Sequence, residues 1–124
     1  MNNKIIIIVI IVIAILFIGF TIIKPKTNFT TITSAQLAEM LLEKDFLLIN
    51  VHIPYEGEIE NTDIFIPYDK LAENLDKLPK DKNAKIVLYC RSGRMSELAA
   101  RELAQLGYTQ VSHLSGGMID WEKR

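Results

Sequence analysis

The clearest candidate for chemistry in this sequence is Cys90, the only cysteine in the chain. It directly follows Lys85–Tyr89, a run typical of a strand buried on both faces, so its position in the fold should be fixed. A cysteine at such a place can also be an inert packing residue. The residues that follow favour a reactive thiol instead, because they are basic, polar and glycine-containing: Arg91, Ser92, Gly93, Arg94, Met95 and Ser96.

This loop provides several groups that stabilise negative charge. Arg91 and Arg94 add fixed positive charges, and Gly93 permits backbone angles that other residues avoid. A helix expected to begin near Ser96 presents unpaired backbone N–H groups at its start. If the loop curls around Cys90, these groups favour the thiolate and bind a small dianion. Such a thiolate is suited to accept a sulfur atom and hold it as a persulfide.

Strands and helices alternate along the chain on both sides of this loop. The pattern predicts strands at 46–51, 63–66, 85–89 and 110–114, and helices at 34–43, 71–78, 96–106 and 118–121. This alternation predicts an α/β domain with a central, mostly parallel sheet and helices on both faces. Ligands of such sheets bind beyond the carboxyl ends of the strands, which is where Cys90 lies.

The sequence around Cys90 resembles the rhodanese family of sulfurtransferases. The resemblance covers about Ser34 to Trp121. It is carried in order by Leu88–Ser96, Ala99–Ala100, Leu103, Leu106–Tyr108, Val111, Leu114–Gly117 and Trp121. It implies a rhodanese-like fold in which Cys90 carries the persulfide and the backbone amides of residues 91–96 cradle it.

The resemblance also implies what the protein binds. Arg91 and Arg94 would bind a small sulfur-containing anion, of which thiosulfate is the usual laboratory example. The acceptor would be cyanide, a thiol or an acceptor protein. We expect no cofactor, no bound metal, no nucleic acid partner and a monomeric chain.

The first half of the domain departs from the family pattern. Many members have Asp, Val and Arg where this chain has Asn50-Val51-His52, and the short helix that often follows is mostly missing. His52 is expected at the rim of the site, as a hydrogen-bonded side chain rather than a base. His113, on a predicted strand, is expected to be structural.

Two other functions compete with sulfur transfer. Phosphatases and arsenate reductases of the related fold place an arginine six residues after the cysteine, where it binds a tetrahedral oxyanion. Here that position is Ser96, and Arg94 is the fourth residue after Cys90. The other alternative is a non-catalytic binding or sulfur-carrier module, but rhodanese-like domains without catalysis commonly lack the cysteine.

The start of the chain has a different composition from the rest. Residues 5–23 carry no charge, and at about 1.5 Å per residue they extend roughly 28 Å, close to the thickness of a bilayer core. The run has no small-residue cleavage site, which favours an uncleaved transmembrane anchor over a signal sequence. A core helix is disfavoured because no polar face exists. The formal net charge of -1 gives no indication of nucleic acid binding.

The expected organisation is therefore an N-terminal tail at 1–4, a transmembrane anchor at 5–23, a linker at 24–33 and a rhodanese-like domain at 34–124. Flanking lysines barely determine the orientation of the anchor, because they occur on both sides of it. An apolar run this close to the start usually keeps its N-terminus in the cytoplasm. We therefore expect the domain to be extracytoplasmic.

Overall fold

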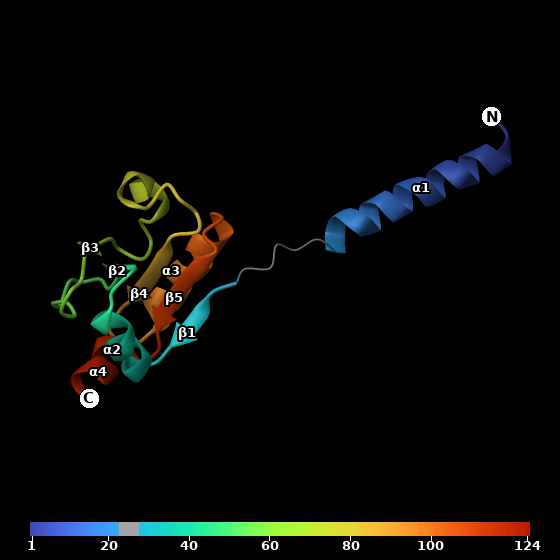
Figure 1. Ribbon diagram of the computed structural model, residues 1–124. Coiled ribbons are helices and arrows are strands. Elements are labelled where there is room, and N and C mark those ends of the chain that lie inside the picture. Colours follow the sequence, from blue (N-terminus) through green and yellow to red (C-terminus); the bar gives the residue numbers. More distant parts are fainter. Residues whose placement is uncertain (23–27) are drawn as a thin grey trace.

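A computed structural model of the chain describes residues 1–22 and 28–124. Helix α1, Asn3–Ile22, lies apart from the remaining elements (Figure 1), and its apolar side chains from Ile5 to Ile18 are exposed. Among the residues described, no helix is long and apolar enough to cross a membrane. The end of the expected anchor and the first part of the expected linker, residues 23–27, lie outside the described residues.

Five parallel strands form the sheet in the described part of the chain, in the order β1-β5-β4-β2-β3. The strands are β1 (Thr30–Ile32), β2 (Leu47–Asn50), β3 (Ile64–Phe65), β4 (Lys85–Tyr89) and β5 (Gln110–Leu114). Because all pairings are parallel, the carboxyl ends of the strands meet at one edge. The central strand β4 therefore places Cys90 in the middle of that edge.

Helices cover both faces of this sheet (Figure 1). Helix α3, Arg94–Gln105, packs on one face, while α2 (Ser34–Leu42) and α4 (Gly117–Glu122) pack on the other. Successive residues of β4 alternate between the two hydrophobic cores, as the pleat of a strand requires. Burial on both faces explains the continuous apolar run, and the predicted parallel α/β architecture is confirmed.

Three elements differ from the prediction. Residues 30–32, expected in the linker, form the edge strand β1, whose polar threonines gave no strand pattern. The expected helix at 71–78 is the 3₁₀ element η1, Ala72–Lys77, interrupted by the non-helical backbone of Asn74. Helix α3 begins at Arg94, two residues before the expected start, because the chain turns sharply at Gly93.

Candidate active site

The loop after β4 curls around the sulfur of Cys90. The cysteine is buried, with 1% of its surface exposed. The backbone N–H of Gly93 donates to Sγ at 3.0 Å, and the thiol donates to the hydroxyl of Ser96 at 3.6 Å. The sulfur therefore lies beside the first turn of α3, where unpaired N–H groups favour negative charge.

Gly93 makes this tight turn possible. Its φ of 109° lies in the left-handed region, which glycine adopts at low cost. A Cβ atom at this position would lie 3.3 Å from the backbone nitrogen of Gly116 and 3.7 Å from the carbonyl oxygen of Leu114. Both the backbone angle and the close packing therefore favour glycine at the position that donates to the sulfur.

The start of α4 holds the same loop from the other side. The N–H of Met118 donates to the carbonyl of Cys90 at 2.9 Å, and the N–H of Ile119 donates to the carbonyl of Arg91 at 3.1 Å. A Cβ on Gly117 would lie 2.3 Å from the Cys90 carbonyl oxygen, so only glycine fits there. These contacts give the Gly116-Gly117 motif, which the sequence supplied only through resemblance, a structural role in the site.

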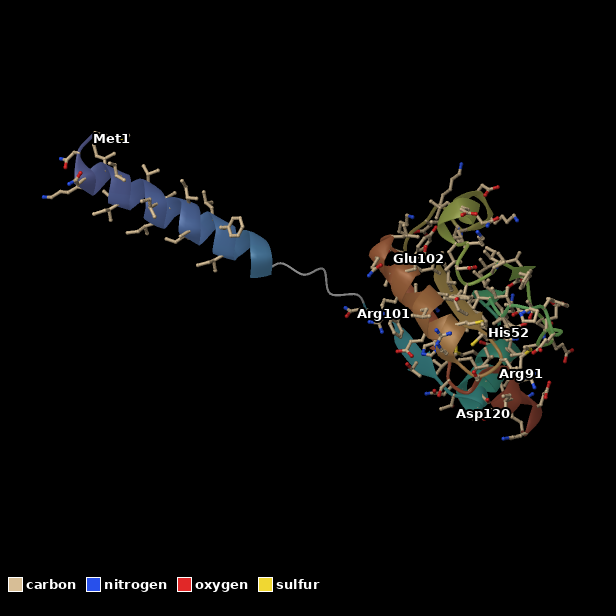
Figure 2. All side chains as sticks on the ribbon, turned by 180° about the vertical axis from the view of Figure 1, so that it is seen from behind. Met1, His52, Arg91, Arg101, Glu102 and Asp120 are labelled. Atoms are coloured by element: carbon tan, nitrogen blue, oxygen red, sulfur yellow. The ribbon has the colours of Figure 1, made fainter. Side chains whose placement is uncertain are left out.

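A charged cluster forms the rim near the end of β2. The carboxylate of Glu56 accepts from Arg91 at 2.9 Å and lies 3.0 Å from Nε2 of His52. Figure 2 shows His52 and Arg91 near one another on this side of the domain. The hydrogen bond from Arg91, aided by His52, holds the pKa of Glu56 below its ordinary value. His52 lies at the rim, as expected, whereas Glu56 is a rim residue that sequence reasoning missed.

Asn50 supports the shortened rim loop. This fully buried residue donates through Nδ2 to the carbonyl of Gly57 at 3.0 Å, and its Oδ1 accepts from the N–H of His52 at 3.0 Å. The two bonds fix both ends of the segment that carries Glu56. An amide at this position both donates and accepts, which an ionised Asp could not do.

A second hydrogen-bonded group lies behind the sulfur. The hydroxyl of Ser96 donates to the carbonyl of Gly93 at 3.0 Å and lies 3.0 Å from Nδ1 of His113. Nε2 of His113 lies 3.2 Å from the hydroxyl of Thr31. Burial lowers the pKa of His113 from its ordinary value of 6.5. His113 was expected to be structural, but the structure connects it to Cys90 through Ser96.

The six loop residues named from the sequence do not share one environment. Gly93 and Ser96 contact the sulfur, and Arg91 lies at the rim. Ser92 and Arg94 line a shallow cavity of about 380 Å³ behind the loop, together with His113 and Thr31. Met95 packs against the hydrophobic core. A direct role of any of the six loop residues in donor binding stays a prediction.

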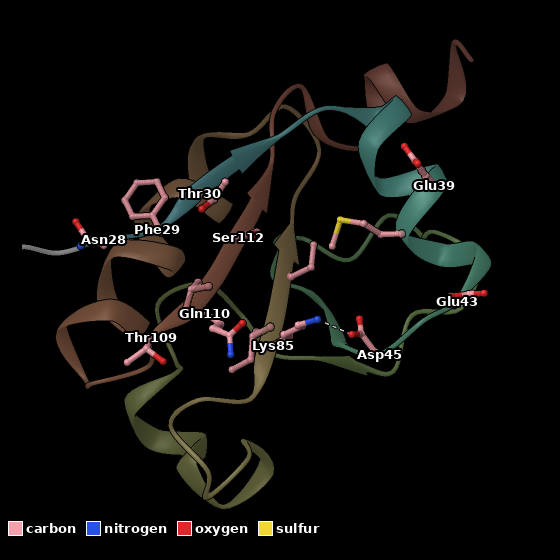
Figure 3. A pocket seen from close by; sticks show the side chains of 14 residues that line it. Asn28, Phe29, Thr30, Glu39, Glu43, Asp45, Lys85, Thr109, Gln110 and Ser112 are labelled. Atoms are coloured by element: carbon pink, nitrogen blue, oxygen red, sulfur yellow. Dashed lines mark hydrogen bonds and ion pairs between the residues drawn. The ribbon is translucent and has the colours of Figure 1, made fainter.

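A larger cavity lies elsewhere. It has a volume of about 480 Å³ and opens between α2 and the beginnings of β1, β4 and β5, with the Asp45–Lys85 ion pair at its side (Figure 3). It contains no cysteine and lies at the amino ends of the strands, opposite to Cys90. Among the described residues, no three His, Cys, Asp or Glu side chains are grouped as a metal site would need. The edge at Cys90 is therefore the better candidate.

The fold and site define a class of parallel α/β domain in which a buried cysteine follows the central strand and accepts a backbone N–H from the next loop. The model of the rhodanese-like domain family matches residues 33–124. The chain therefore belongs to the rhodanese-like domain family.

Individual relatives agree with this assignment. A sulfurtransferase of Allochromatium vinosum is 34% identical over 74% of this chain and 87% of the relative. A tRNA uridine(34) hydroxylase of Erwinia tasmaniensis is 32% identical over 73% of this chain, but this covers only 28% of the relative's length. The crystal structure of a rhodanese-related protein from Thermoplasma volcanium is 31% identical, with a TM-score of 0.65, over 76% of this chain and 91% of that one.

Proposed function

We propose that the protein is a sulfurtransferase that carries sulfane sulfur on Cys90. The observation that supports this most strongly is the buried sulfur of Cys90, which accepts the N–H of Gly93 at the start of α3. This geometry stabilises a thiolate and, after transfer, the negative charge of a persulfide. The family and the sulfurtransferase relative support the same chemistry.

The reaction has two steps, written here with thiosulfate as donor. The thiolate of Cys90 attacks the outer sulfur of thiosulfate, a new S–S bond forms, and sulfite leaves with the electron pair of the bond that breaks. Cyanide or a thiolate then attacks the outer sulfur of the persulfide, and the thiolate of Cys90 leaves. Arg91 at the rim attracts the anionic donor, and Arg94, which lines the cavity behind the loop, adds positive charge from the other side. The second step produces thiocyanate or a new persulfide.

The test measures the intact mass of the protein after incubation with thiosulfate. We expect a gain of one sulfur atom, which subsequent cyanide removes as thiocyanate. The Cys90→Ser variant, which keeps the size of the side chain, should gain nothing. A chain that gains no sulfur from thiosulfate or from a small persulfide donor would instead be a non-catalytic module.

The phosphatase alternative is tested with a generic aryl phosphate. In this fold position 96 would need an arginine to close on the tetrahedral phosphate, whereas here it is a buried serine bonded to the sulfur. We expect no turnover. Turnover that the Cys90→Ser variant abolishes would overturn the sulfurtransferase proposal.

We also propose that residues 5–23 anchor the chain in a membrane, with the domain on the extracytoplasmic side. The uncharged sequence of this run and the exposure of its described apolar side chains support the anchor. Accessibility of the domain to an added protease in intact cells tests the orientation, and protection until lysis would contradict it.

A further inference from the structure

A continuous chain of hydrogen-bonding groups leads from the sulfur of Cys90 to the far side of the loop. Ser96 Oγ lies 3.6 Å from Sγ and 3.0 Å from Nδ1 of His113. On the other side of the imidazole, Nε2 lies 3.2 Å from Oγ1 of Thr31. Ser96 and His113 are buried, while Thr31 is exposed, so the chain connects a buried thiol to solvent.

The position of His113 results from the order of the strands. Strand β5 pairs with β4 and with the edge strand β1, and Thr31 is paired in register with His113. Helix α3 brings Ser96 over the same face. The Phe29 ring and the imidazole pack in a T-shaped pair with their centroids 5.6 Å apart, which holds the imidazole in place.

The hydroxyl of Ser96 has more partners than it has hydrogens. It has one hydrogen, and both the Gly93 carbonyl and Nδ1 of His113 lie 3.0 Å away, while the thiol donates to the same oxygen. If Nδ1 is unprotonated, the hydroxyl donates to it and its lone pairs face the thiol. If Nδ1 is protonated, it donates to the hydroxyl oxygen, and the hydroxyl hydrogen is free to point at the sulfur. The state of His113 thus determines whether Ser96 favours the thiol or the thiolate.

We propose that Ser96 and His113 form a proton relay for Cys90, in which His113 is a positioning residue that acts through Ser96. The Sγ–H bond breaks as Ser96 Oγ takes that proton, and the original hydroxyl proton passes to Nδ1. A thiol and a neutral imidazole thereby become a thiolate and an imidazolium, with no proton lost. The proton then leaves from Nε2 through Thr31. The inference rests on the proposed function, because it supplies the thiolate that attacks the donor.

The surroundings of His113 fit this role. Burial lowers its pKa, so the imidazole is neutral near pH 7 and can accept a proton. The Glu97 carboxylate from α3 partly offsets this effect and stabilises the imidazolium. Glu97 and Arg94 are the charged residues that line the shallow cavity beside His113, and Arg101 packs over the Phe29 ring. The proton therefore leaves on the side of the loop opposite to the rim at Arg91.

The test is the rate at which iodoacetamide alkylates Cys90 in the full chain, measured between about pH 5 and about pH 9. This rate follows the thiolate fraction. A thiol and an imidazole that share a proton titrate as a pair. We therefore expect two steps in the wild-type profile. A single step in the folded wild-type chain would overturn the relay even without a variant.

His113→Asn is the decisive variant, because its side-chain amide retains a hydrogen bond near the position of Nδ1 but takes up no proton. We expect one step and an alkylation rate about tenfold lower near pH 7, as for the loss of one hydrogen bond to a charged group. Ser96→Ala should show the same change. A wild-type profile in folded His113→Asn or in Ser96→Ala would overturn the relay.

Ser112→Ala is the matched control, because it is the same serine-to-alanine substitution at the residue that directly precedes His113 in the sequence. Ser112 lines the larger cavity rather than the loop, and its variant should keep both steps. Alkylation needs no sulfur donor, so it is independent of the proposed reaction. A chain that takes no sulfur but shows the two-step profile would refute the proposed function and support the relay.

Discussion

At the scale of single residues, the rim carries a negative charge at a place where an anion is expected to enter. Glu56 binds the guanidinium of Arg91, which is half-exposed, so an anionic donor that used Arg91 would compete with this carboxylate. Because the donor would replace an anion already bound to Arg91, its binding free energy would be less favourable than at an unpaired arginine. If Arg91 binds the donor as proposed, Glu56 would limit the affinity for small dianions and favour donors with less negative charge.

We predict that Glu56→Gln lowers KM for thiosulfate. The substitution removes the competing charge and keeps the shape of the side chain. The effect should be modest, about two- to fivefold, because exposed ion pairs are weak. Steady-state kinetics with cyanide as acceptor measures it. Glu60→Gln, an equivalent change on an exposed residue of the same loop, should leave KM unchanged. An unchanged KM in Glu56→Gln would show that Arg91 does not bind the donor.

A second prediction at this scale concerns His113 and stability. Burial lowers the pKa of His113 in the folded chain below 6.5, the value expected when the chain is unfolded. Below that pH the unfolded chain binds the proton more readily, so the free energy of unfolding falls as the pH drops. Well above pH 6.5, His113 makes no contribution to the pH dependence of the free energy of unfolding. Urea unfolding at a series of pH values should show this loss in the wild type and a smaller loss in His113→Asn. An equal loss in the wild type and in His113→Asn would show that other titrating groups cause the pH dependence.

At the scale of elements, the site consists of one loop held between two helix starts. Helix α3 supplies the N–H of Gly93 to the sulfur, and α4 supplies two N–H groups to the carbonyls behind it. Donation to the Cys90 and Arg91 carbonyls fixes the loop from behind. The curvature of the loop is therefore a property of the α3–α4 pair as well as of its own sequence.

We predict that Gly117→Ala disrupts the loop. Its Cβ would lie 2.3 Å from the Cys90 carbonyl and 2.5 Å from the backbone of Arg91, so the loop must move. Gly107→Ala is the matched control, because Gly107 also has a positive φ but its Cβ would meet nothing within 4 Å. The control should lose about 1–2 kcal/mol of stability and keep sulfur transfer. Gly117→Ala should lose more stability in urea unfolding and most of its sulfur uptake by intact mass. Normal uptake would contradict this role of α4.

The sequence predicted those parts of the site that depend on local pattern. The apolar run of β4 predicted where Cys90 lies, and Gly93 predicted the tight loop. The contact of Ser96 with His113 was not predictable in this way, because it joins residues 17 positions apart through the pairing of β4 with β5. Glu56 was missed for a similar reason, since only the path of the rim loop brings it to Arg91, 35 positions away.

At the scale of the whole molecule, the site and the start of β1, where the described chain enters the domain, lie at opposite edges of the sheet. The chain enters the domain at Thr30, the start of β1, and the strands are all parallel. Cys90 lies at the opposite edge, beyond the carboxyl ends. If residues 5–23 are held in a membrane, the active-site edge is directed away from the point of attachment. An acceptor protein would then reach Cys90 from the aqueous side.

The last prediction tests this arrangement with the full chain. We expect the protein to remain with the membrane fraction after an alkaline carbonate wash. Ile10→Lys combined with Ile13→Lys should release it, because each lysine costs about 2.5–3.5 kcal/mol at the centre of a spanning helix. The matched control makes the same change at two exposed apolar residues of the domain, Leu42→Lys with Leu75→Lys, and should remain bound. Both variants should still take up sulfur on Cys90, since neither pair of residues lies near the loop. Release of the wild type by carbonate would contradict an anchor, and loss of sulfur uptake only in the α1 variant would show that this segment also acts on the site.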